Sequence, residues 1–177
     1  MLALKETKPM TVTLHDGLSH FIDFRKDVIT KRTVFKLNKA REKANILIGL
    51  AIAVNNIDAI IDLIKKSKNP AEAKTKLLNT KWSVKSNITQ YIKLINPSFK
   101  SSASKILLDE EQAKAILELR LQKLTALERD DLFNNLKSLV DNINNYLKIL
   151  NSNKQLLKVL KDELAEIKDN FATPRKT

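Results

Sequence analysis

The sequence predicts an all-α fold: a long antiparallel coiled-coil arm that carries a small helical knob, with a short extended N-terminal segment. The 177 residues include only two glycines and four prolines, the two residue types that disfavour helices most strongly. Leucine, isoleucine and alanine recur at spacings of three and four along two long stretches, which is the pattern of helices that pack along a seam. Aromatic residues make up only 5%, so we expect long packed helices rather than a thick globule.

The N-terminal segment, residues 1–17, should be extended. A proline and a glycine punctuate it, and its MTVTL stretch alternates as a short strand does. Either Asp16 or Ser19 could cap the helix that follows, because both are residue types that accept a hydrogen bond from the first helical turn.

Residues 18–54 predict one ascending coiled-coil helix. Gly49 is its one unfavourable residue, at a cost of about 1 kcal/mol, which a long helix tolerates. Small alanines in the seam would let a partner helix approach closely. The residues of this seam are Leu37, Ala40, Ala44, Leu47, Ala51 and Val54.

Residues 55–124 predict a knob of short helices. The asparagine pair 55–56 marks a corner at its start. Asn69 precedes a proline and should cap a helix, with Glu72 completing a capping box. Trp82, the only tryptophan, should anchor this region.

Two further capping boxes frame the leucine-rich stretch AILELRLQKLTALERD. Asp109 and Gln112 should open the helix that enters this stretch, and Thr125 and Glu128 should restart a helix after a corner. The restart predicts returning coiled-coil helices over residues 125–171.

The returning helices carry two runs of apolar residues separated by an interruption at residues 151–152, and the tail 172–177 should fray. The first run is Leu132, Leu136, Leu139, Ile143, Tyr146 and Leu150. The second run is Leu157, Leu160, Leu164, Ile167 and Phe171.

The net charge of +12 favours contact with nucleic acid or another anionic surface. Biased composition explains the excess of lysine about as well. On the first helix, the basic residues Arg25, Lys31, Arg32 and Lys36 form a stripe that could neutralise DNA phosphates without reading bases. The equally weighted alternative is a solvated face of a coiled coil.

The sequence excludes several kinds of chemistry. It has no cysteine, hence no disulfide, cysteine-type zinc site or cysteine nucleophile. No carboxylate falls at metal-ligand spacing between His15 and His20, and acids near a histidine, such as Asp16 and Asp23, occur by chance. Tyr91 and Tyr146 are better explained by packing than by catalysis. The most apolar window, ANILIGLAIAV, is too short to cross a bilayer, and the stretch MLALKETKPM has no apolar core of signal-peptide length, so we expect a cytoplasmic protein that does not contact a membrane.

Three stretches together resemble the A subunits of the bacterial type IIA DNA topoisomerases. They are HFIDFRKDVITKRTVFKLNKAREKANIL, NNIDAIIDLIKKSKNPAEAK and EEQAKAILELRLQKLTALE. Their order and spacing match from about residue 4 to the C-terminus. NPAEAK and the ending near FATPRKT resemble DNA gyrase more than topoisomerase IV, which stays an alternative.

The resemblance implies a position and a role. In this family the region is the arm that follows the tower domain and ends in the knob of the exit gate, or C-gate, where two copies meet. The leucines at the corner would then serve a homodimer contact, centred on Leu117, Leu121 and Leu124 with Arg120 and Lys123 at its rim. A two-fold axis would make the contact isologous.

The resemblance also implies what lies elsewhere. The family's DNA-cleaving tyrosine belongs to a preceding domain, in a motif that neither tyrosine here matches, so we expect no catalytic residue, no metal and no activity from this fragment alone. ATP and magnesium ions would bind other domains of the parent enzyme. The implied partners are a second copy, the B subunit of gyrase, and the DNA duplex that passes between the arms. A free-standing basic nucleic-acid-binding module and a coiled-coil scaffold remain the alternatives.

Overall fold

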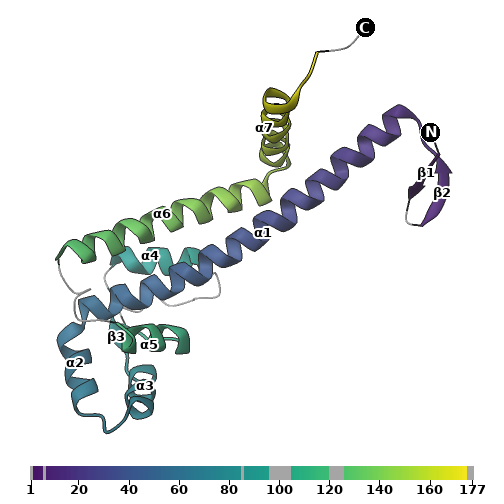
Figure 1. Cartoon of the computed structure of the whole chain (residues 1–177). Helices are drawn as coiled ribbons and strands as arrows, with labels where there is room; N and C mark the ends of the chain where they lie inside the picture. Colours follow the sequence, from purple (N-terminus) through teal and green to yellow (C-terminus); the bar gives the residue numbers. More distant parts are fainter. Residues whose placement is uncertain (1, 6, 85, 96–104, 120–125, 175–177) are drawn as a thin grey trace. The chain divides into compact units, whose positions relative to one another are not determined.

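The computed structural model describes residues 2–5, 7–84, 86–95, 105–119 and 126–174 (Figure 1). Helices account for most of this part of the chain and the strands are short, which confirms the all-α prediction. The chain divides into two compact units. We call Met1–Lys36 with Asn145–Thr177 the stalk unit, and Leu37–Asn144 the knob unit.

The stalk unit begins with a β-hairpin. Strands β1 (Leu2–Lys5) and β2 (Lys8–Thr11) are antiparallel, with Leu2 opposite Thr11. Thr7 in the turn has φ 68°, a left-handed conformation that is uncommon outside glycine, asparagine and aspartate. The extended segment expected from the sequence is therefore a paired hairpin rather than a single strand.

Helix α1 (Leu14–Asn55) begins four residues earlier than the sequence predicted, so residues 14–17 are helical. The reason is a reciprocal cap. The Asp16 N–H donates to Thr13 Oγ1 at 3.2 Å, and the Thr13 N–H donates to Asp16 Oδ2 at 3.1 Å. Thr13 is therefore the capping residue, and Asp16, predicted as a possible cap, is the partner three residues later.

Helix α7 (Asn153–Phe171) packs on the first part of α1. Ile29 of α1 is buried against Leu156 and Leu160, with Ile149 and Val159 half-buried around them. Of the second predicted run, only Leu160 is buried, whereas Leu157, Leu164, Ile167 and Phe171 are exposed. Leu156 is buried in place of Leu157 because α7 is a new helix and does not continue α6. The Ser152 side chain accepts from the Gln155 N–H at 3.4 Å and starts this helix, which turns residues 156 and 160 toward α1.

The knob unit is built on the second part of α1. Helices α2 (Ile57–Lys65), α3 (Pro70–Asn79), α4 (Ser86–Ile95) and α5 (Glu110–Leu117) follow, and α6 (Ala126–Asn151) begins in it. Strands β3 (Trp82–Ser83) and β4 (Lys105–Ile106) pair antiparallel. Helix α3 packs against both α2 and α5.

The two seams of the knob unit agree with the sequence in most positions. Every α1 seam residue is buried except Leu47, which is half-buried. On α6, Leu136 and Ile143 are fully buried as expected, but Val140 is buried where the pattern predicted Leu139. Trp82 is buried and its Nε1–H donates to the Leu77 carbonyl at 3.0 Å, so it does anchor the small helices.

Asn56 holds the corner between α1 and α2. Its Nδ2 donates to the carbonyls of Ile52 at 2.8 Å and Ser83 at 2.9 Å, and its Oδ1 accepts from Ser83 Oγ at 2.6 Å. The two helices bend by 88° there. Within the described residues, no single helix is both long enough and apolar enough to span a membrane; α1 and α2 meet those criteria only as a bent pair.

Candidate functional site

Helix α5, which leads into the leucine-rich stretch, is fixed to α1 by a buried glutamine. Gln112 is only 5% exposed. Its Nε2 donates to the backbone carbonyl and to the side-chain Oδ1 of Asn45, both at 2.9 Å. Its Oε1 accepts from the Asp109 N–H at 3.0 Å, the half of the predicted capping box in which the third helical residue reaches back. A buried amide is stable only when its groups are hydrogen-bonded, so these bonds define one position for α5.

Gly49 makes this close approach possible. A Cβ at residue 49 would lie 2.7 Å from both Cβ and Cγ of Gln112, far inside the 3.5–4.0 Å at which carbon atoms pack. The sequence showed Gly49 only as a tolerated weakness in a long helix. Its role is found in the space that it leaves for α5.

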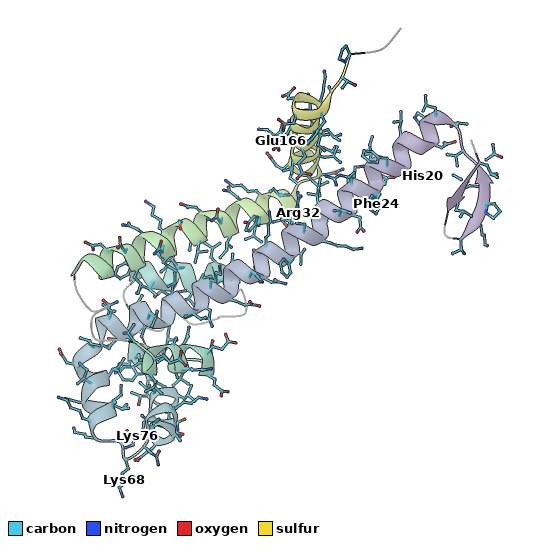
Figure 2. All side chains as sticks on the ribbon, viewed as in Figure 1. His20, Phe24, Arg32, Lys68, Lys76 and Glu166 are labelled. Atoms are coloured by element: carbon cyan, nitrogen blue, oxygen red, sulfur yellow. The ribbon has the colours of Figure 1, made fainter. Side chains whose placement is uncertain are left out.

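The other side of α5 meets α3 through charges. Lys74 pairs with Glu110, and Lys76 pairs with Glu72 at 2.7 Å within α3. The hydrogen bond from Lys74 lowers the pKa of Glu110, and the hydrogen bond from Lys76 lowers the pKa of Glu72. Lys76 and Lys68 are labelled near the α2–α3 loop in Figure 2.

The start of α3 follows the sequence with one difference. Asn69 Oδ1 accepts from the Glu72 N–H at 2.8 Å, and Pro70 occupies the first turn, as its position predicts. The Glu72 carboxylate, however, accepts from the Lys68 N–H at 2.9 Å and not from Asn69. The box therefore closes one residue further upstream.

The candidate dimer contact falls mostly outside the described residues. Leu117 is the last residue of α5 and is half-buried. The other four members of the predicted contact lie beyond the described part, as does the predicted cap Thr125; those four are Arg120, Leu121, Lys123 and Leu124. Glu128 lies in α6, and its side chain is also outside the described part.

The candidate basic face is largely engaged in ion pairs within the stalk unit. Arg25 Nη2 lies 2.7 Å from Glu163 Oε2, and Arg32 pairs with the other oxygen of the same carboxylate. Lys31 pairs with Asp27 at 2.7 Å, one helical turn away. Among the described residues, Lys36 makes no ion pair. The sequence analysis did not single out Glu163. A signal was present, because Glu163 lies three residues after the seam residue Leu160, at a position that flanks the contact between two packed helices.

The histidines and tyrosines considered for metal binding or catalysis lie on three different helices, α1, α4 and α6. In the described part of the chain, no group of three or more histidine, cysteine or acidic side chains is placed so that it could hold a metal ion. His15 and His20 are exposed on the first turns of α1, and Tyr91 and Tyr146 are half-buried on α4 and α6. The hydrogen bonds from Thr13 lower the pKa of Asp16, which makes Asp16 a structural anion of the helix start.

Comparison with known proteins gives the same family that the three quoted stretches resemble. Residues 1–165 match the family of the A subunits of DNA gyrase and topoisomerase IV. The DNA gyrase A subunit of Rickettsia felis is 48% identical over 178 residues, covering 100% of this chain and 20% of that protein. The A subunit of Buchnera aphidicola subsp. Baizongia pistaciae is 43% identical, with 100% and 22% covered, and that of Aeromonas salmonicida is 40% identical, with 99% and 20% covered.

The chain thus spans about a fifth of the length of the curated relatives it matches. The similarity runs along the whole chain and includes the long helix, the capped α3 and the stretch that α5 enters. The chain therefore belongs to the family formed by the A subunits of DNA gyrase and topoisomerase IV.

Proposed function

We propose that this chain is the homodimerisation and exit-gate (C-gate) module of the A subunit of a bacterial type IIA DNA topoisomerase of the gyrase type. Two copies meet through the corner that contains Leu117, Leu121 and Leu124. The contact holds the subunits together while DNA is broken elsewhere in the enzyme. It then opens to release the transported duplex during ATP-dependent supercoiling.

The attachment of α5 is the observation that carries the proposal. Gln112 ties α5 to α1 through Asn45, and Lys74 ties it to α3 through Glu110. Helix α5 is therefore held on two sides, and the leucine-rich corner begins at its last residue. A recognition surface works best when rigid elements present it, because less ordering is needed on binding.

The parent enzyme would supply the remaining chemistry. Its cleaving tyrosine, its ATP site and its magnesium ions are expected on segments other than this chain, so the fragment alone should not change DNA topology. The proposed partners are a second copy, the B subunit of gyrase, and double-stranded DNA. A gate that must be able to open needs a moderate, partly polar contact between the two copies. Arg120 and Lys123 at the rim of the contact would provide its polar part.

Light scattering on the Leu121→Glu variant tests the contact. The unaltered chain should form a dimer of twice 20.1 kDa. A glutamate at the centre of an isologous contact places two like charges together, so Leu121→Glu should be monomeric with unchanged helicity.

Leu107→Glu is the matched control, because Leu107 is an exposed leucine of the knob unit outside the corner. It should remain dimeric. If Leu121→Glu stays dimeric while folded, the corner is not the contact.

The scaffold alternative makes a different prediction. Ile143 is fully buried on α6. If copies of the chain assemble along the seams, a change at Ile143 should dissociate the assembly while each chain stays folded. Under the gate proposal, Ile143→Glu unfolds the knob unit instead. Circular dichroism on the same samples separates the two.

A free-standing nucleic-acid-binding module is the second candidate, and the net charge of +12 favours it. The ion pairs of Arg25, Arg32 and Lys31 count against it, because basic groups already paired within the chain give weaker phosphate contacts. Strong duplex binding by the fragment, falling steeply with salt, would support this candidate.

A further inference from the structure

Glu163 joins two arginines that the sequence placed on a DNA-facing stripe. Its Oε2 lies 2.7 Å from Arg25 Nη2, and its Oε1 pairs with Arg32. The arginines are seven residues apart on α1, so they lie on one helix face with Ile29 between them. Ile29 is buried against Leu156 and Leu160, which precede Glu163 on the same face of α7. The contact between the two helices is thus an apolar centre with a charged cluster beside it.

The cluster carries more positive than negative charge. Two guanidinium groups share a single carboxylate, which leaves one net positive charge. The Arg32 side chain is 41% exposed, whereas Arg25 and Glu163 are 26% and 24% exposed. Ion pairs with this much solvent contact contribute little to stability, so an external anion can exchange with Glu163 at low cost.

The apolar part of the contact is short. After Leu160, the apolar residues of α7 are solvent-exposed, with Phe171 77% exposed. Arg25 and Glu163 instead border a shallow hollow of about 240 Å³ with Glu166, Ile167, Asn170 and Phe171. Figure 2 labels Arg32 on α1 and Glu166 on α7. The ion pairs of Glu163 therefore join α7 to α1 where the apolar contact has ended, and because each pair is weak, their loss can free this part of α7.

We propose that duplex phosphates compete with Glu163 for Arg25 and Arg32, so that DNA passing along the stalk loosens α7 from α1. The proposal rests on the proposed passage of a duplex between two arms. Phosphate and carboxylate present similar oxygen pairs to a guanidinium, and arginine binds both in a bidentate manner. Each arginine exchanges one anionic partner for another, and the freed Glu163 returns to water.

The electrostatic surroundings favour approach from the Arg32 side. Glu166 lines the same hollow as Arg25, and its negative charge repels a phosphate that enters there. On α1, Lys36 follows Arg32 by one turn and makes no ion pair among the described residues, so it adds attraction on that side. Lys31 is adjacent but is paired with Asp27.

Duplex binding by Glu163→Gln against Glu166→Gln tests the competition. The two variants remove the same charge one helical turn apart, and only the first frees two arginines. Fluorescence anisotropy with a labelled duplex of about 20 base pairs should show roughly tenfold tighter binding by Glu163→Gln, the cost of breaking two part-exposed pairs. Glu166→Gln should differ from the unaltered chain by about twofold or less.

Hydrogen exchange supplies a readout that a purely structural clamp would not change. Adding duplex to the unaltered chain should speed amide exchange in α7 around residues 156–163. The double variant Arg25→Gln, Arg32→Gln should show fast exchange there with or without DNA. Equal duplex affinities for Glu163→Gln and Glu166→Gln, absence of binding by Glu163→Gln, or slower α7 exchange with DNA would overturn the proposal.

These results do not depend on the gate. If the exit-gate function is wrong, light scattering of the same samples gives a monomer, and the difference between the two variants is measured equally well on that monomer. If the competition is wrong, the dimer persists and the two duplex affinities coincide.

Discussion

Gly49→Ala should destabilise the chain, although replacing a helical glycine by alanine normally stabilises it. In a helix interior the exchange is worth about 1 kcal/mol in favour of alanine. At this position the added methyl would lie 2.7 Å from Cβ and Cγ of Gln112. Gln112 Cβ is attached directly to the α5 backbone, so rotating the side chain does not relieve the overlap, and α5 must shift.

The size of the effect follows from the contacts that the shift disturbs. Overpacking a filled site costs about 1–3 kcal/mol. Weakening the two hydrogen bonds from Gln112 to Asn45 adds about 0.5–1.5 kcal/mol for each bond that is lost. With both bonds lost, and after subtracting the favourable helix term of about 1 kcal/mol, the net loss is about 1–5 kcal/mol, which lowers the melting temperature by several degrees or more in a chain of this size.

Gly17→Ala is the matched control. Gly17 lies in the same helix, and nothing comes within 4 Å of an added Cβ there. It should therefore gain up to about 1 kcal/mol. Urea unfolding of the three proteins, followed by circular dichroism, should give shifts of opposite sign. Stabilisation by Gly49→Ala equal to that of Gly17→Ala would refute the argument that Gly49 exists to admit Gln112.

Two further predictions concern α3. Asn69→Ala should cost about 1 kcal/mol, because it leaves the Glu72 N–H without its acceptor; an unchanged urea midpoint would show that water replaces the cap. Glu72 and Glu110 have pKa values lowered from 4.5 by Lys76 and Lys74, so their contribution is present above that pH and is lost as the pH falls through the lowered values. The double variant Glu72→Gln, Glu110→Gln should therefore lose less stability than the unaltered chain between about pH 5 and pH 3, and identical acid profiles would contradict this.

Local sequence signals predicted the elements that depend on local interactions. The cap and proline at Asn69 start α3, and the interruptions at residues 55–56 and 151–152 do separate helices. The start of α1 was missed because Thr13 lies within the alternating stretch MTVTL, which is typical of a strand, and Thr13 pairs with Asp16 only once the chain turns. Patterns of this kind are fixed by neighbours within four residues.

Interactions between distant segments were harder to predict. The spacing of leucines on α7 is regular, yet it does not say which face meets α1; the new start at Ser152 decides that. Gln112 and Asn45 are 67 residues apart, and Glu163 and Arg25 are 138 apart. In the sequence, Arg25 and Arg32 have no obvious acidic partner, because Glu163 lies on another helix. For that reason the sequence indicated that they could bind phosphates but did not reveal their ion pairs.

The central claim is that two copies meet through the corner around Leu121, and a single introduced cysteine tests it most directly. The chain has no cysteine of its own, so Leu121→Cys places one thiol in each copy, close to the proposed two-fold axis. Mild oxidation should convert this variant to a covalent dimer on a denaturing gel, whereas Ser138→Cys, exposed on α6, should stay monomeric. Efficient crosslinking at Ser138 and none at Leu121 would contradict the exit-gate account.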